Sequence, residues 1–135
     1  MKKIILIGAG GHAKSCIDVI ELTKEYEIFG LIDSTEPHRF DIDGYHIIGD
    51  DNDLITIRKN VDHALIAIGQ IESPKNRIKL YNLLKKYGYK LPSIRSPRSY
   101  ISSKSKIGEG TIIMHDVIVN SGSTIGNNCI INNII

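Results

Sequence analysis

The chain has 135 residues, a mass of 15.0 kDa and a formal net charge of +2 at pH 7. This length suits one ordinary domain or two small ones, and it is too short for a complete two-domain dehydrogenase or kinase. With 41% hydrophobic and 24% charged residues, the composition is that of a folded globular protein rather than a disordered or fibrous one. The small net charge gives no reason to expect a nucleic-acid partner.

The sequence gives little indication of a signal peptide, a membrane span or a disulfide framework. The N-terminal apolar run, residues 4–7, is shorter than the apolar core of a signal peptide and ends in glycines. No run approaches the roughly 20 apolar residues that span a bilayer. Cys16 and Cys129 lie far apart and do not indicate a disulfide framework. These features predict a cytoplasmic protein without a membrane span.

The first ninety residues alternate between strand-like and helix-like segments. Residues 3–7 are a β-branched apolar run typical of a strand buried on both faces, and apolar residues recur at helical spacing over residues 13–24. Further strands are predicted at residues 27–33, 44–49 and 63–69, and a short helix at residues 50–57. A last helix is expected to begin with Ser73 as N-cap and Pro74 as first helical residue, and to stop at Gly88. This alternation predicts a parallel α/β sheet.

A glycine-rich turn follows the first predicted strand. Gly8, Gly10 and Ala13 have the spacing of the dinucleotide fingerprint in its G/A form. Its glycines let the backbone approach a phosphate, and the free N–H groups of the helix start bind the anion. Asp33, at the end of the second predicted strand, stands where an acid bonds a ribose hydroxyl. The alternative is a tight turn with a purely structural role.

The ends of three predicted strands meet at one edge of the sheet, where open parallel sheets bind their ligands. The candidate substrate-binding residues at these ends are Gly10, Gly11, His12, Asp33, Ser34 and Gly69. His12 would donate a hydrogen bond to an anion or a sugar hydroxyl, or it is a solvated residue at a helix start.

Basic residues are concentrated between residues 73 and 100, where there are eight of them and no acidic residue. A solvated helix face is the simpler explanation. Attraction of a phosphorylated ligand is the alternative.

From residue 101 the pattern changes to a period of six. The aliphatic positions are Ile101, Ile107, Ile113, Val119, Ile125 and Ile131. A small or β-branched residue stands two positions before each of the later five. This period predicts a parallel β-helix, in which each hexapeptide supplies one side of a triangular coil and glycine or asparagine occupies the corners. Strands of a β-sandwich would instead alternate with period two.

Residues 101–135 amount to about two coils, and the sequence stops in an apolar segment. Solenoids generally need about three repeats and end in a polar cap. An uncapped coil also exposes an unpaired strand edge. We therefore expect the chain to be truncated relative to a longer relative, or to cover its end by association.

The combination of these two parts resembles the sialic acid O-acetyltransferases and nucleotide-amino-sugar N-acetyltransferases of NeuD/PglD type. The matching motifs are IGAGGHAK at residues 7–14, GLID at 30–33, GYHIIG at 44–49, AIG at 67–69, IGEGTII at 107–113 and IGNNCIIN at 125–132. The resemblance covers essentially the whole chain. It implies an α/β fold, with a Rossmann-like parallel sheet that binds a nucleotide sugar in residues 1–98. The first coils of a left-handed parallel β-helix would follow in residues 99–135.

The resemblance also implies a reaction. An acetyl group would pass from acetyl-CoA to an amino or hydroxyl group of a nucleotide-activated sugar or sialic acid, in surface-glycan biosynthesis. The family is homotrimeric, with acetyl-CoA between neighbouring subunits. The nucleotide sugar would lie at Gly10, Gly11 and His12, after the second strand at Asp33 and Ser34, and at Gly69.

The sequence departs from the family pattern at two places. The resemblance implies a catalytic base, a histidine next to an acid, in the stretch immediately after Asn133. This sequence ends before reaching that stretch. His115 and Asp116 form the only histidine–acid pair in the repeats, but they lie about one coil earlier and receive no role. Ser96 stands where the family commonly has a histidine. We therefore assign neither a catalytic residue nor a metal ligand.

Two other functions stay open. The glycine-rich turn and Asp33 favour an NAD-dependent oxidoreductase, although the hexapeptides argue against it. The third candidate is a non-catalytic protein that binds a nucleotide sugar or acts in assembly.

Overall fold

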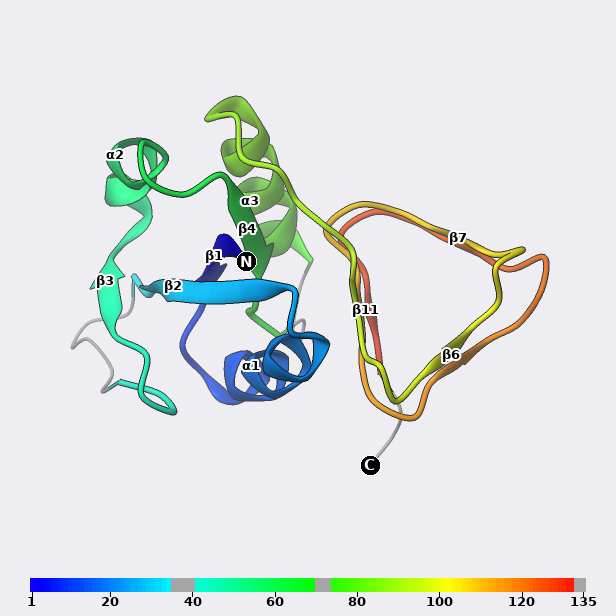
Figure 1. Ribbon diagram of the computed structural model, residues 1–135. Coiled ribbons are helices and arrows are strands. Elements are labelled where there is room, and N and C mark those ends of the chain that lie inside the picture. Colours follow the sequence, from blue (N-terminus) through cyan, green and yellow to red (C-terminus); the bar gives the residue numbers. More distant parts are fainter. Residues whose placement is uncertain (35–40, 70–73, 133–135) are drawn as a thin grey trace.

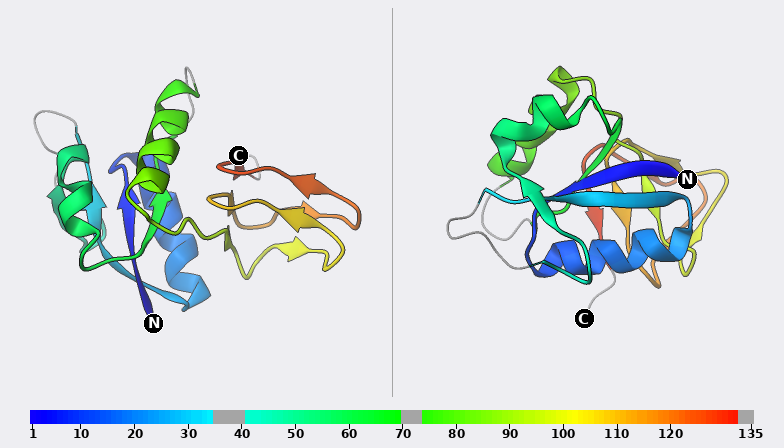
Figure 2. Two further views of the ribbon diagram at one scale, coloured as in Figure 1. Left: turned by 90° about the horizontal axis from the view of Figure 1, so that it is seen from above. Right: turned by 60° about the vertical axis from the view of Figure 1, so that its left-hand side comes forward.

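The computed structural model describes residues 1–34, 41–69 and 74–132. An α/β unit with a parallel sheet lies beside a solenoid of triangular cross-section (Figure 1). Figure 2 shows the solenoid coils stacked in layers next to the α/β unit. No helix in the described ranges is both long and apolar enough for a membrane span.

The sheet is parallel and has the strand order β3-β2-β1-β4. Its strands are β1 (Lys2–Ile7), β2 (Tyr26–Ile32), β3 (Ile47–Gly49) and β4 (His63–Ile66). Its helices are α1 (Gly11–Thr23), the 3-10 turn η1 (Asp51–Asp53), α2 (Leu54–Ile57) and α3 (Lys75–Lys86). This arrangement confirms the predicted Rossmann-like parallel sheet.

Strand β1 is buried on both faces, as its apolar run predicted. Ile4 and Leu6 pack with α1 in one core, whereas Ile5 and Ile7 pack with α2 and α3 in the other. Helix α1 therefore covers one face of the sheet, and α2 and α3 cover the opposite face (Figure 1).

The predicted element boundaries shift by a few residues. Helix α1 begins at Gly11 rather than residue 13, and Lys24 ends it in a left-handed conformation with φ 57°. Strand β4 stops at Ile66 rather than residue 69. Helix α3 begins after Pro74, so this proline occupies the N-cap instead of the first helical position, and Ser73 lies outside the described residues.

The solenoid consists of short parallel strands that pair with strands one coil away. They are β5 (Ile94–Arg95), β6 (Tyr100–Ile101), β7 (Lys106–Ile107), β8 (Ile112–Ile113), β9 (Ile118–Val119), β10 (Thr124–Ile125) and β11 (Ile130–Ile131). They form three sheets, β11-β8-β5, β6-β9 and β10-β7. Ile112 pairs with both Ile94 and Ile130, so one coil takes 18 residues. This confirms the hexapeptide prediction of a parallel β-helix, while its left-handedness stays a prediction.

Period-six residues form the interior of the solenoid. Ile113 and Val119 are buried, and the other four predicted positions pack against them. Asn128 and Gly110, one coil apart, have φ values of 55° and 69°, which fits the predicted corner positions.

The solenoid joins the α/β unit without a gap in the apolar core. Ile94, Ile112 and Met114 belong to the same buried cluster as the apolar face of α1. Because β5 lies upstream of residue 99, solenoid pairing begins before the predicted second domain, and the division at residue 98 stays a prediction. The shared core places the carboxyl edge of the sheet next to the first coils.

Candidate functional site

The glycine-rich turn after β1 is held in a conformation that requires glycine at residue 8. Gly8 has φ +127°, and a Cβ at this position would lie 2.8 Å from Ile68 Cγ2 and 3.0 Å from the carbonyl carbon of Ala67. Its N–H donates to the Ile32 carbonyl at 2.7 Å. The turn is thereby wedged between the ends of β2 and β4, and it feeds directly into α1.

The start of α1 has no side-chain cap. Gly10 is the N-cap residue and carries no side chain, so the first-turn N–H groups, including that of Gly11, receive no side-chain hydrogen bond from it. Unsatisfied N–H groups and the positive end of a helix dipole favour an anionic ligand. This geometry suits a phosphate group.

A cavity of about 210 Å³ opens at the carboxyl ends of β1 and β2. Asp33 and Ser34 line it, together with Gly8, Asp51 and Asn76, the last from the first turn of α3. Asp33 is buried, and the Asp51 N–H donates to Ser34 Oγ at 3.3 Å. Two carboxylates and a hydroxyl accept hydrogen bonds from sugar hydroxyls and would repel a phosphate. The cavity is therefore suited to a ribose or sugar.

A second hollow, of about 540 Å³, lies on the other side of the turn. It is lined by Gly10, Gly11 and Lys14 of the turn and α1, and by residues Asp41, Ile42 and Asp43 of the segment before β3. The structure thus divides the predicted site: Asp33 and Ser34 line one cavity, and Gly10 and Gly11 line its neighbour. Gly69 is exposed just after β4, next to Ile68 of the first cavity.

His12 lines neither hollow. Its ring is partly buried, and Nε2 lies 3.4 Å from Cys16 Sγ, one turn further along α1. Burial lowers the pKa of His12, and the nearby Arg77 guanidinium lowers it further. The lowered pKa favours the neutral imidazole, which keeps one N–H donor. The partly buried ring does not fit a fully solvated residue, and donation by His12 to an anion or a sugar hydroxyl stays a prediction.

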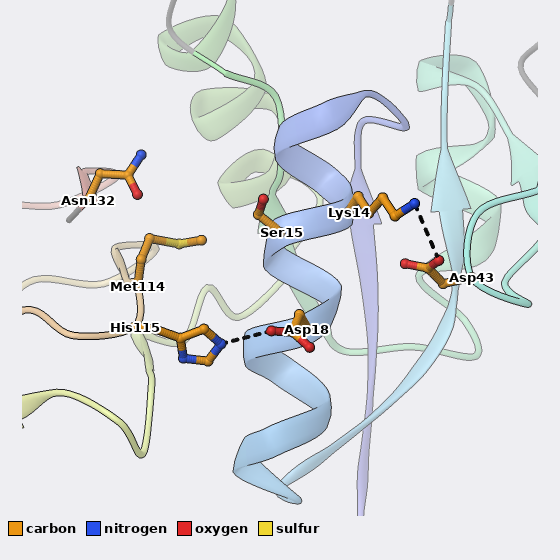
Figure 3. A pocket seen from close by; sticks show the side chains of 7 residues that line it. All are labelled: Lys14, Ser15, Asp18, Asp43, Met114, His115 and Asn132. Carbon is orange, nitrogen blue, oxygen red and sulfur yellow. Dashed lines mark hydrogen bonds and ion pairs between the residues drawn. The ribbon is translucent and has the colours of Figure 1, made fainter. Parts of the chain in front are cut away.

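A third opening, of about 530 Å³, runs between α1 and the solenoid (Figure 3). Lys14, Ser15 and Asp18 of α1 face Met114, His115 and Asn132 across it. Lys14 and Asp43 line this groove as well as the hollow at the turn, so the two openings adjoin. Its size falls within the roughly 300–1,000 Å³ of small-molecule pockets.

His115 is held on both ring nitrogens at the edge of this groove. Nε2 lies 2.9 Å from Asp18 Oδ2 (Figure 3). Nδ1 lies 2.5 Å from Ser96 Oγ. Asp116, its sequence neighbour, instead lies 3.8 Å from the Arg98 guanidinium. The acid next to His115 in space is thus 97 residues away in sequence, and no local pattern pointed to it.

Comparison with known proteins assigns the family. The model of the PglD N-terminal domain matches residues 3–84, which is more than half of the chain. The chain belongs to the NeuD/PglD-type family. A second model, the bacterial transferase hexapeptide (six repeats), matches residues 104–133 of this PglD-type chain. A comparison with curated protein sequences gave no match.

Two of the solved structures similar to the PglD-type chain are acetyltransferases. A histidine-to-asparagine variant of perosamine N-acetyltransferase from Caulobacter crescentus, in complex with CoA and GDP-perosamine, is 30% identical with a TM-score of 0.89. The match covers 98% of this chain and 61% of that one. The acetyltransferase domain of PglB from Neisseria gonorrhoeae, in complex with acetyl coenzyme A, is 23% identical with a TM-score of 0.85, covering 98% and 62%. This second likeness shows the shared fold, and the chain spans about three fifths of either relative.

Proposed function

We propose that the chain is the nucleotide-sugar-binding part, with the first solenoid coils, of an acetyl-CoA-dependent sugar acetyltransferase. The observation that carries the proposal is the adjoining pair of openings, one at the glycine-rich turn and one between α1 and the solenoid, which share Lys14 and Asp43. A ligand with its diphosphate at the turn can extend its sugar towards Asn132 of the solenoid. The similar perosamine N-acetyltransferase was solved with CoA and GDP-perosamine, which supports a nucleotide-sugar substrate and an acetyl-CoA donor.

In this proposal each of the two predicted domains binds one substrate. Residues 1–98 hold the nucleotide sugar, with the diphosphate at Gly10 and Gly11 and the ribose hydroxyls at Asp33 and Ser34. Residues 99–135 begin the left-handed solenoid that carries acetyl-CoA. The reaction would serve surface-glycan biosynthesis in the cytoplasm.

Assembly into a homotrimer, with acetyl-CoA between neighbouring solenoids, is part of the same proposal. It is supported by an apolar strip on one face of the first coils. Tyr100 and Ile118 pair in register and are 62% and 70% exposed. Large apolar side chains that stand together on a surface are typical of protein interfaces. Light scattering of the purified chain would report the trimer or a different oligomer.

Acetyl transfer needs a base for the proton of the attacking amine or hydroxyl and a donor for the oxyanion that forms on the thioester carbonyl. His115 is ill suited as that base, because Asp18 and Ser96 engage both of its ring nitrogens. We propose that the base is a histidine of the following coil, as the family resemblance implies. The 135-residue chain should then release no CoA from acetyl-CoA when an amino-sugar nucleotide is added. Sustained turnover would contradict this placement.

Calorimetric titration tests the binding half of the proposal. The chain should bind GDP-perosamine or UDP-N-acetylglucosamine, and Asp33→Asn should weaken that binding by about tenfold, the value of one hydrogen bond to a charged group. Asp62→Asn is the matched control, because Asp62 pairs with Arg58 outside the three openings. Tighter binding of NAD than of either sugar nucleotide would favour the oxidoreductase alternative. Absence of binding to all three ligands would refute the proposed site.

A further inference from the structure

Helix α3 presents a stripe of polar side chains to the corners of the solenoid. Arg77, Tyr81 and Lys85 are spaced by four and therefore share one face of the helix. Tyr81 donates to Glu109 Oε2 at 2.5 Å, and Lys85 Nζ lies 3.1 Å from Glu109 Oε1. These two hydrogen bonds lower the pKa of Glu109. The middle and end of α3 are thus attached to the first coil at residue 109.

Arg77 attaches the start of α3 to the next coil. Its side chain is 1% exposed, and Nη2 donates to the carbonyl oxygen of Asn128 at 3.2 Å and to its Oδ1 at 2.8 Å. The Asn128 side-chain amide returns a hydrogen bond to the Arg77 carbonyl at 3.3 Å. On its other side, Nη1 donates to the carbonyl oxygens of Ile66 at 3.2 Å and Ile68 at 2.9 Å. One guanidinium therefore joins the end of β4 to a solenoid corner.

Burial of the Arg77 guanidinium has a desolvation cost that its contribution to folding stability does not explain. Four neutral oxygens hold the Arg77 guanidinium, and no ion pair within the described ranges includes it. A buried charge loses its hydration, so an apolar side chain of similar size is often as stabilising. A planar guanidinium instead offers fixed donor directions, which set the geometry of every group it binds.

The groups that Arg77 connects include the wall of the candidate nucleotide cavity. Ile68, whose carbonyl it holds, lines that cavity, and so does Asn76, its neighbour on α3. At the opposite end of the link, Asn128 has φ 55°, a left-handed conformation that fixes the corner of the coil. A short path of hydrogen bonds therefore connects the cavity wall to the second coil.

We propose that Arg77 is a positioning residue that couples the nucleotide cavity to the solenoid corner at Asn128. The inference rests on the proposed function, because it assumes that a nucleotide sugar occupies the cavity. Binding there orders the carbonyl of Ile68, and Arg77 transmits this to the coil on which the acetyl donor would lie. The coupling aligns the two substrates without contact between Arg77 and either of them.

Heteronuclear NMR of the 135-residue chain tests the coupling. GDP-perosamine and UDP-N-acetylglucosamine are the probes, and the backbone amide signals of Asn128 and Cys129 are the readout. In the wild type the bound probe should shift both signals, although they lie outside the cavity. Asn128→Gly keeps the left-handed backbone but removes both side-chain hydrogen bonds. The Arg77 bond to the carbonyl of residue 128 remains, so this variant should keep probe affinity within about threefold and lose part of the corner shift.

Two further variants complete the design. Arg77→Lys retains the charge but cannot bridge Ile68 and Asn128 together, so it should lose more of the corner shift than Asn128→Gly does. Lys79→Ala, at an exposed position of α3, should respond as the wild type does. If Arg77→Lys does not fold, Asn128→Gly alone decides the question. The coupling would be overturned if the amide signals of residues 128 and 129 do not shift in the wild type with probe bound, or if they shift equally in Asn128→Gly. Either result would leave the proposed function standing. No binding by the wild type would overturn both.

Discussion

Substitution of Gly108 by alanine probes how the two coils are stacked. A Cβ on Gly108 would lie 2.5 Å from the backbone carbon and oxygen of Gly126 and 2.2 Å from Asn127 Oδ1. Ordinary contacts begin near 3.4 Å, so the facing backbone must retreat by roughly 1 Å. Backbone torsion plays no part, because Gly108 does not have a positive φ.

The cost follows from the contacts that would be displaced. Overpacking of this kind costs about 1–3 kcal/mol. The Gly108 N–H bond to the Ile125 carbonyl, at 2.9 Å, and the Glu109 N–H bond to Asn127 Oδ1, at 3.0 Å, would both weaken, for about 1 kcal/mol each. Alanine has less conformational entropy than glycine in the unfolded chain, which offsets the loss of stability by about 0.4–1 kcal/mol. The net loss in the free energy of unfolding is about 2–5 kcal/mol.

Gly126 provides the matched control one coil further on. The nearest atom to its built Cβ is Cys129 Sγ at 3.9 Å, so Gly126→Ala should change the free energy of unfolding by less than about 0.5 kcal/mol. Urea unfolding of both variants, followed by circular dichroism, measures the difference. Equal stability of Gly108→Ala and Gly126→Ala would refute the stacking of residue 108 against residue 126.

Three further predictions address the α/β unit and the thiols. Gly8→Ala combines a positive φ with a 2.8 Å contact, so it should destabilise the chain by about 2–4 kcal/mol in urea, whereas Gly11→Ala, with no neighbour within 4 Å, should not; a tolerated Gly8→Ala would contradict the wedged turn. At pH 8 a thiol reagent should modify Cys129 and not Cys16, because burial raises the pKa of Cys16 to about 12; rapid modification of both thiols would show that α1 is not packed as described. The lowered pKa of His12 means that the folded state binds its proton less readily than the unfolded state does, so its contribution to stability is complete above about pH 6.5 and is lost as the pH falls. His12→Gln should therefore flatten the decline in unfolding free energy between pH 7 and pH 5, and an unchanged slope would be evidence against a neutral, buried ring.

Periodic features of the sequence predicted most of the fold. In β1 and in the solenoid, each buried position requires an apolar residue. The resulting pattern of apolar residues therefore predicts these elements directly. Single positions were less predictable. Leu22 and Ile78 have helical apolar spacing but are 42% and 51% exposed, because none of the described residues covers those parts of α1 and α3.

Sequence patterns did not predict the contacts between the α/β unit and the solenoid. Arg77 belongs to the basic run for which a solvated helix face was the simpler explanation. Lys79 and Lys86 fit that explanation, but Arg77 is fully buried and the prediction is wrong for it. The His115 contact with Asp18 joins residues 97 positions apart. Such pairs depend on how the solenoid is docked, which composition and spacing do not encode.

The candidate site was predicted as a location more accurately than as a set of side chains. Asp33 and Ser34 line a cavity at the strand ends as expected, since parallel strands bring their carboxyl ends to one edge. His12 turns into the helix start beside Cys16, and its ring orientation depends on the packing of α1 rather than on the motif. Whether these residues bind a nucleotide sugar stays a prediction.

A crystal structure of the chain with GDP-perosamine bound tests the central claim most directly. The account predicts the diphosphate at the first-turn N–H groups of α1, ribose hydroxyls within hydrogen-bond distance of Asp33 or Ser34, and the sugar in the groove beside Asn132. A ligand bound away from the carboxyl edge of the sheet, with the turn at Gly10 and Gly11 left empty, would contradict it.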